Sequence, residues 1–122
     1  MTLEFLPQKF TVAKLPHNTP IPEGNFVFTA RTDDEYSLLC PTSEIPADAL
    51  VREDGWRGMR IVGTLEFSLI GILAKISAAL ANAGVGIFAV STFDTDYIFM
   101  KEENLVRAKD ALLRAGYEIR DM

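Results

Sequence analysis

The sequence is poor in the side chains on which most enzyme chemistry depends. It has one cysteine and one histidine among 122 residues. One cysteine cannot form an intrachain disulfide, and one cysteine with one histidine cannot build a usual zinc site. The histidine, His17, lies in a proline-rich loop and is interpreted as a solvated residue rather than a general base. We therefore expect no catalytic residue, no metal site, no cofactor and no enzyme activity.

Basic residues are also few. Twelve Lys and Arg against seventeen Asp and Glu give a formal net charge of -5, and no Lys/Arg run occurs. Nucleic acid is an unfavourable partner, because affinity for it depends on neutralising phosphates. The longest apolar stretch, residues 69–90, is interrupted by Lys75, Asn82 and three glycines, which is a poor pattern for a membrane span. The N-terminus has no basic region followed by an apolar run. We expect a cytoplasmic protein.

The length and composition predict a packed core. A chain of 122 residues fits one compact domain or two small half-domains, and 48% of its residues are hydrophobic. The pattern divides near residue 54. Residues 1–54 are predicted to form a strand-rich N-terminal half, and residues 55–122 a second domain.

In the N-terminal half, residues 10–15, 26–32 and 35–40 are rich in β-branched and aromatic side chains and predict strands. A loop is expected between the first two strands, and about one helical turn between Pro41 and Pro46. Cys40 ends the third strand. We interpret it as a buried strand cysteine, and the alternative is a reactive thiol.

The second half has a clearer pattern. Residues 56–67 predict a strand, and residues 68–82 a helix whose apolar stripe follows the helical period, with Ser68 as N-cap and Gly84 as terminator. Residues 85–92 and 95–101 predict a hairpin, 102–115 a second helix and 117–120 a last strand. This order is the ferredoxin-like βαββαβ arrangement of the α+β class. It places two helices on one face of a four-stranded antiparallel sheet.

Two segments are candidate binding sites. At residues 66–72, free backbone N–H groups at a helix N-terminus can receive a carboxylate, and Gly71 would let a ligand approach closely; tight packing is the alternative role for this glycine. At residues 91–96 (STFDTD), Asp96 shares a strand face with Ile98 and Met100, where it could bind an ammonium or guanidinium group. A solvated strand end is the alternative. A free amino acid is the simplest ligand that carries both charges.

One helix face bears on assembly. Gly71, Ala74, Ala78 and Ala81 lie on the back of the predicted helix 68–82. Small side chains there allow close contact with a partner chain, which we favour over an exposed alanine face selected for helix propensity.

At these residues the sequence resembles a known family. Residues 62–73 (VGTLEFSLIGIL) and 87–98 (IFAVSTFDTDYI) are similar to the small bacterial ACT-domain proteins, which are related to the regulatory domains of aspartate kinases and to the CASTOR-type arginine sensors. Residues 31–40 resemble the N-terminal half of these proteins, so this half is expected to be ACT-like. Where the common ACT loop reads Asp-x-Pro-Gly, this chain has SLIG, which keeps the glycine alone.

The resemblance implies a regulatory protein that binds an amino acid between ACT units. Carried over by position, the ligand-binding residues are Ser68, Leu69, Ile70, Gly71, Ile72, Thr92, Phe93 and Asp96. We expect a homodimer that holds an amino acid at a subunit or half-domain interface and changes its contacts with a target protein. The alternatives are a structural or dimerisation module without ligand and, less favoured, an enzyme.

Overall fold

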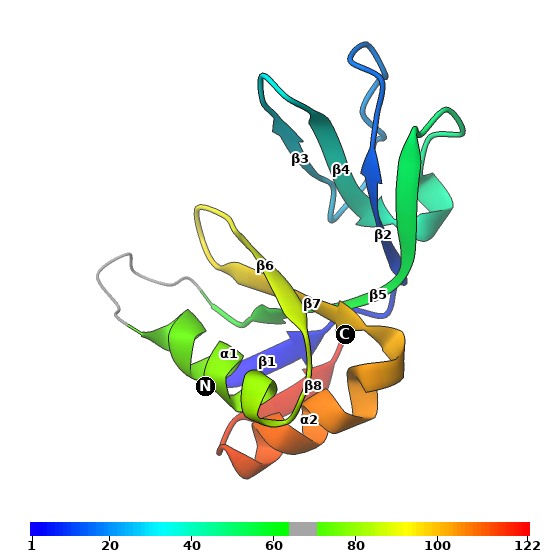
Figure 1. Cartoon of the computed structure of the whole chain (residues 1–122). Coiled ribbons are helices and arrows are strands. Elements are labelled where there is room, and N and C mark those ends of the chain that lie inside the picture. The colour runs from blue at the N-terminus through cyan, green and yellow to red at the C-terminus, as the bar shows by residue number, and fades with distance from the viewer. Residues whose placement is uncertain (64–70) are drawn as a thin grey trace. The chain divides into compact units, whose positions relative to one another are not determined.

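The computed structural model describes residues 1–63 and 71–122. It contains two compact units, shown in Figure 1. The strand unit comprises Gln8–Trp56. The helical unit comprises Met1–Pro7 and Arg57–Met122. Strand β5 (Val51–Ile61) contributes residues to both units. The predicted domains 1–54 and 55–122 stay a prediction.

The strand unit is an antiparallel sheet. Strands β2 (Phe10–Lys14), β3 (Phe28–Arg31) and β4 (Tyr36–Pro41) correspond to the three predicted strands, and the first half of β5 completes the order β3-β4-β2-β5. The 3-10 turn η1 (Thr42–Glu44) lies where one helical turn was predicted. The core of this unit consists of buried side chains from these strands and the residue after β2: Ala13, Leu15, Tyr36, Leu38 and Cys40.

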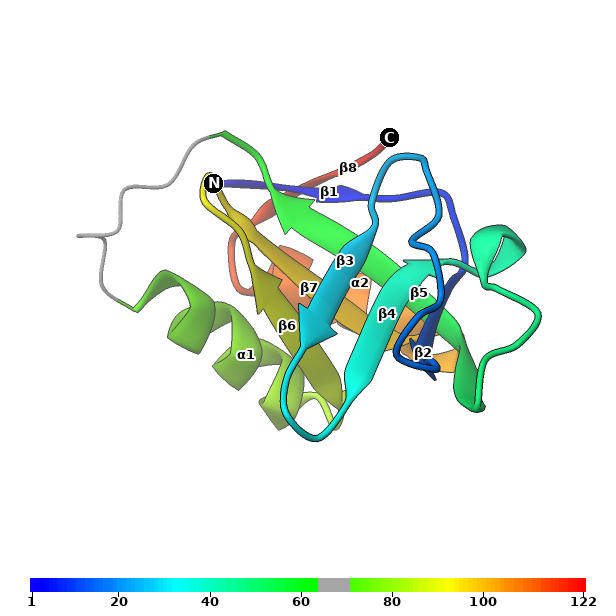
Figure 2. The same cartoon turned by 90° about the horizontal axis from the view of Figure 1, so that it is seen from above.

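The helical unit confirms the predicted βαββαβ order. After β5 come α1 (Ile72–Asn82), β6 (Ile87–Ser91), β7 (Asp96–Lys101), the 3-10 turn η2 (Glu102–Asn104), α2 (Leu105–Arg114) and β8 (Glu118–Asp121). Strand β7 pairs with β5 and β6. Figures 1 and 2 show α1 and α2 on the same side of this sheet. The fold is therefore the ferredoxin-like α+β arrangement.

The helical unit also contains a strand that the sequence pattern did not reveal. Strand β1 (Thr2–Phe5) pairs antiparallel with β5 and parallel with β8. It thus lies between the first and last strands of the predicted four-stranded sheet. Its register is fixed by Leu3 opposite Ile61 on one side and opposite Ile119 on the other. The first residues of the chain are consequently an interior part of the sheet.

The core of the helical unit follows from the periodicity of its elements. Because side chains alternate along a strand, every second residue of β1, β5 and β7 faces the helices. The buried cluster contains, from the strands, Leu3, Phe5, Met59, Ile61, Ile98 and Met100, and from the helices, Ile76, Leu80, Ala108 and Leu112. The residues between them, such as Glu4, Arg60 and Tyr97, lie on the opposite side of the sheet, which we call the far face. The far face carries polar side chains and also the stacked rings of Phe88 and Phe99.

The predicted end of the first helix is confirmed at Gly84. This residue has φ 75°, a left-handed conformation that suits glycine. Its N–H donates to Ala81 O at 3.0 Å, and the next N–H, from Val85, donates to Leu80 O at 2.9 Å. This pair of hydrogen bonds is the Schellman motif. It turns the chain into β6 and buries Val85 in the core.

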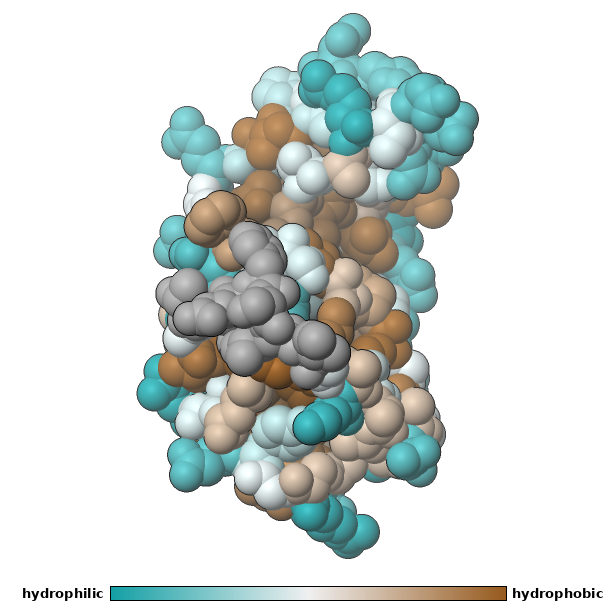
Figure 3. Space-filling model, turned by 90° about the vertical axis from the view of Figure 1, so that its left-hand side faces the viewer, coloured by the Kyte–Doolittle hydropathy of each residue, from teal (hydrophilic) through white to brown (hydrophobic). Residues whose placement is uncertain are grey.

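The small residues on the back of α1 lie at the surface. Ala74, Ala78 and Ala81 are exposed in the chain by itself. Figure 3 shows weakly hydrophobic residues on the side of the molecule where α1 lies. Burial of this face against a partner chain stays a prediction. Among the described residues, neither helix has the length and hydropathy needed to cross a membrane.

Candidate functional site

Three strand ends meet at one edge of the helical unit's sheet. The hydroxyl of Thr95, just before β7, donates to Ile61 O at the end of β5 over 2.8 Å. Ser91, the last residue of β6, is paired with Asp96, the first residue of β7. Both views in Figures 1 and 2 show that α1 begins at this same end of the unit. The described part of the first predicted segment, Gly71 and Ile72, and the second segment, residues 91–96, therefore lie at one edge of one sheet.

The connection between β6 and β7 is a tight turn at residues 92–95. Thr92 N donates to Thr95 O at 2.8 Å, and the Thr92 hydroxyl donates to the same carbonyl at 2.9 Å. Thr95 N donates back to the Thr92 hydroxyl at 3.3 Å. Phe93 at the tip of the turn is 82% exposed. The predicted hairpin is confirmed, and the Thr92 backbone and hydroxyl form the hydrogen bonds that close its turn.

Asp96 lies on the helix-covered face of the sheet, as the strand alternation predicted. Its Oδ1 accepts a hydrogen bond from the Ser91 hydroxyl at 2.6 Å. The side chain is partly buried. Among the described residues, Oδ2 has no partner in the structure. A half-buried carboxylate with one free oxygen can accept hydrogen bonds from a cation.

The strand unit contains the same turn without this carboxylate. Thr32 N donates to Glu35 O at 2.9 Å and Glu35 N donates to the Thr32 hydroxyl at 3.1 Å, so residues 32–35 repeat the bonding of residues 92–95. The residue after the turn, at the position of Asp96, is Tyr36, which is buried. The turn therefore closes without an aspartate at this position, so the turn itself does not explain why Asp96 is there.

Helix α1 begins next to a left-handed glycine. Gly71 occupies the N-cap position with φ 81° and ψ 4°, and a Cβ added there would meet no atom within 4 Å. The first helical hydrogen bond runs from Lys75 N to Gly71 O at 2.9 Å. The N–H groups of the first turn, starting at Ile72, precede this bond and have no intrahelical acceptor. Within the described residues no side chain caps the helix. The predicted site residues Ser68, Leu69 and Ile70 lie outside the described residues.

A second polar cluster, not predicted from the sequence, lies on the far face of the same sheet. The Glu4 side chain, 10% exposed, accepts hydrogen bonds from Arg60 Nε to Oε1 and from Arg120 Nε to Oε2, both at 2.9 Å. The Arg60 hydrogen bond is the largest influence that lowers the pKa of Glu4, with burial opposing it. The pKa of Arg60 is raised, first by its hydrogen bond with Tyr97 and then by Glu4. Three strands are thus joined by one carboxylate.

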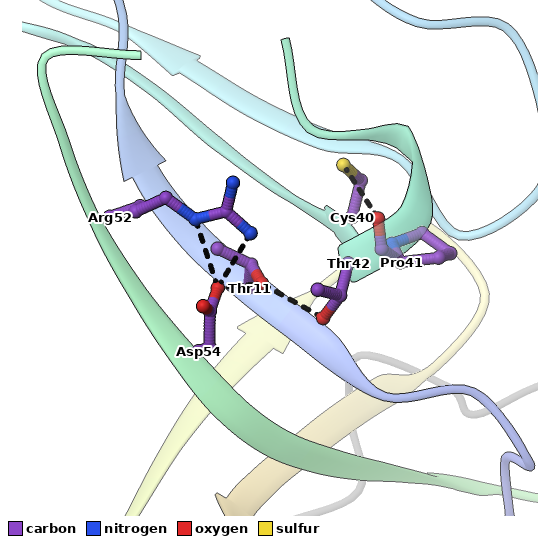
Figure 4. A network of polar contacts seen from close by, with 6 residues as sticks. All are labelled: Thr11, Cys40, Pro41, Thr42, Arg52 and Asp54. Atoms are coloured by element: carbon purple, nitrogen blue, oxygen red, sulfur yellow. Dashed lines mark hydrogen bonds and ion pairs between the residues drawn. The ribbon is translucent and has the colours of Figure 1, made fainter. Parts of the chain in front are cut away.

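A polar network in the strand unit connects strands β2 and β5 with the turn after β4 (Figure 4). Thr11, fully buried, donates to Asp54 Oδ1 at 2.6 Å, and that oxygen also accepts from Arg52 at 2.9 Å. Since a carboxylate does not donate, the Thr42 hydroxyl must donate the 2.8 Å bond that joins it to Thr11. The network fixes two strands and the turn after β4.

Cys40 is buried, as predicted. Its Sγ donates to Pro41 O at 3.4 Å. Burial raises the pKa of the thiol to about 11, and the Glu44 carboxylate adds to the effect. The thiolate is the reactive form, so the environment of Cys40 opposes nucleophilic or redox chemistry. In the described part of the chain, no three His, Cys, Asp or Glu residues gather as metal ligands.

Comparison with known families identifies the fold. The ACT domain matches residues 51–114, which is more than half of the chain. The chain therefore belongs to the ACT-domain family, whose members are regulatory modules. A search of the curated proteins found no significant match.

Solved structures agree with this assignment. A crystal structure of a protein from Agobacterium tumefaciens is 33% identical, with 99% of this chain and 92% of that chain covered and a TM-score of 0.87. The aspartate kinase of Clostridium acetobutylicum is 16% identical, with 88% and 33% covered and a TM-score of 0.63. The ligand-free regulatory subunit of Thermus thermophilus aspartate kinase is 12% identical, with 89% and 93% covered and a TM-score of 0.58. At the two lower identities the likeness shows the fold alone.

Proposed function

We propose that this protein is an amino-acid sensor, in which Asp96 and the start of α1 bind the two charged groups of a free amino acid. The observation that supports it is the place of Asp96: half-buried, held by Ser91, and at the same sheet edge as the first turn of α1. The repeated turn in the strand unit has Tyr36 at this position, so local structure does not require the carboxylate.

The chemistry of the two groups is complementary to an amino acid. The ammonium group would bind the free Oδ2 of Asp96 through a charge-assisted hydrogen bond. The carboxylate would bind the N–H groups of the first turn of α1, where the helix dipole also favours negative charge. Because the Cβ direction at Gly71 is open, a ligand can approach its backbone there. Phe93, at the exposed tip of the turn, would cover the ligand's side chain.

The protein is proposed to act as a homodimer, with the ligand between the ACT domains of two subunits. The exposed alanines on the back of α1 permit close contact with a second chain, and the regulatory subunit of an aspartate kinase shares the fold. Ligand binding would then change the contacts of the dimer with a target protein. In this proposal the protein has no catalytic role and works in the cytoplasm, without a cofactor.

A thermal-melt screen of the purified protein against the twenty amino acids, each at millimolar concentration, tests the proposal. A ligand present at about one hundred times its dissociation constant stabilises the folded state by about 2.7 kcal/mol, which at this chain length raises Tm by several degrees. We expect one or a few amino acids to produce such a shift. If none does, amino-acid sensing is refuted and a ligand-free dimerisation module remains.

Two variants locate the site. Asp96→Asn removes the charge but keeps the size of the side chain, and it should strongly reduce the ligand-induced shift. Gly71→Asp places a negative charge against the ligand carboxylate and should have the same effect. Asp33→Asn in the turn of the strand unit is the matched control and should respond like the parent protein. A normal shift in Asp96→Asn would contradict the assigned site even if an amino acid binds.

A further inference from the structure

The far face of the helical unit's sheet contains a hollow that the proposed sensor site does not use. Its volume is about 290 Å³, just below the range of roughly 300–1,000 Å³ that is usual for small-molecule sites. It is lined by residues of β1, β5, β7, β8 and the two loops at the sheet edge: Glu4, Arg60, Ile61, Val62, Gly63, Asp94, Thr95, Tyr97 and Arg120. All of them belong to the helical unit.

The hollow has two positive and two negative side chains, but they do not all have hydrogen-bond partners. Arg60 and Arg120 carry positive charge, and Glu4 and Asp94 carry negative charge. Both oxygens of Glu4 are engaged, because each accepts a hydrogen bond from one guanidinium group. Arg120 uses its Nε for that bond, and its two terminal nitrogens have no partner among the described residues. Asp94 likewise has no hydrogen bond or ion pair there.

The unsatisfied groups have opposite charges and lie on different elements. Arg120 is in β8, where Ile119 packs on the core and Arg120 therefore projects from the far face. Asp94 is in the turn between β6 and β7. Glu4 holds the Arg120 side chain in place, which lowers the entropic cost of binding an anion there. A guanidinium with two free nitrogens matches a carboxylate, and an aspartate matches an ammonium group.

We propose that this hollow is a second small-molecule site, in which Arg120 binds the carboxylate and Asp94 the ammonium group of a small zwitterion, of which a free α-amino acid is the simplest. A doubly charged anion such as phosphate is disfavoured, because the four side chains carry no net charge and Asp94 would repel it. The site is independent of Asp96, which lies on the helix-covered face of the same sheet.

The two sites can be separated by NMR. Backbone amide shifts of the ¹⁵N-labelled protein are followed during titration with each of the twenty amino acids. Binding at the far face should move the amides of Gly63, Asp94 and Tyr97. Binding at the sensor site should move those of Ile72 and Leu73. Shifts in the second group alone would overturn the far-face site and leave the sensor proposal intact, and shifts in the first group alone would do the reverse.

Variants and analogues test the chemistry of the far-face site. Asp94→Asn and Arg120→Gln should each weaken binding there about tenfold or more, because each removes a hydrogen bond to a charged group. Asp34→Asn is the matched control, since Asp34 has the corresponding place in the turn of the strand unit. Acetate and methylamine each carry one of the two charges and should bind more weakly than the amino acid. Equal binding of acetate, or unchanged binding by Asp94→Asn, would overturn the proposal.

Discussion

Gly58 in β5 allows an aromatic ring to lie against the far face of the sheet. A Cβ at residue 58 would be 2.6 Å from Cε2 and 2.9 Å from Cδ2 of Phe99. Phe99 is fully buried and stacks on Phe88, with ring centroids 5.2 Å apart and an interplanar angle of 17°. The ring therefore cannot move without disturbing a second ring. We predict that Gly58→Ala destabilises the protein.

The magnitude follows from two opposing effects. Overpacking of a well-packed core costs about 1–3 kcal/mol. Replacing glycine by alanine where the backbone allows it contributes about 0.4–1 kcal/mol in the opposite direction, because the unfolded chain loses freedom. Gly58 does not have positive φ, so this second effect applies. The net loss should be about 0.5–2 kcal/mol, or a decrease in Tm of roughly 2–10 °C at this size.

The assay is thermal and urea unfolding followed by circular dichroism, with two controls. Gly86→Ala is the matched substitution, because Gly86 also lacks positive φ and a Cβ there would meet nothing within 4 Å. It should leave Tm unchanged or raise it. Phe99→Leu in the Gly58→Ala background should reduce the cost of the alanine, which gives a coupling energy of about 0.5 kcal/mol or more. Equal stability of Gly58→Ala and Gly86→Ala, or no coupling to Phe99, would refute the reasoning.

Three further predictions follow from the polar groups. The pKa of Glu4 is lowered in the folded state, so its contribution to stability is present above the usual carboxyl range and is lost as pH falls through that range. The free energy of unfolding of Glu4→Gln should therefore depend less on pH in the acid range. Thr11→Val should cost about 1–2 kcal/mol in urea unfolding, whereas Thr11→Ser, which keeps the hydroxyl, should cost less. The Cys40 thiol, whose pKa is about 11, should react with a thiol reagent near neutral pH only after denaturant is added; rapid labelling of the native protein would contradict its burial.

The sequence alone predicted those elements whose pattern lies within a short stretch of residues. The apolar stripe of α1 and the glycine after it predicted a helix, and the structure buries Ile76 and Leu80 and ends the helix at Gly84 as expected. The alternation in β7 placed Asp96 on the face of Ile98 and Met100. Each of these patterns depends on residues a few positions apart, where the geometry of helix and strand fixes the spacing.

The sequence alone did not predict elements and contacts whose partners lie far away along the chain. Strand β1 is four residues long and followed by Pro7, and nothing in its composition shows that β5 and β8 pair with it. The same holds for Glu4, whose two guanidinium partners are 56 and 116 positions away. Contacts at such separations are set by the packing of whole elements. The far-face site could therefore be recognised only once the three-dimensional structure was known.

The two units offer an internal comparison that neither the sequence pattern nor the family assignment contains. Both hairpins close with a threonine that bonds to the residue three positions later, at residues 32–35 and 92–95. After the turn, the strand unit buries Tyr36 and the helical unit presents Asp96 to its partner Ser91. A buried aromatic ring at this position stabilises a core, whereas a half-buried carboxylate with a free oxygen costs stability unless a cation binds it. Asp96→Tyr should thus leave the fold intact and remove amino-acid binding at the sensor site, which separates the role of the turn from the role of the charge.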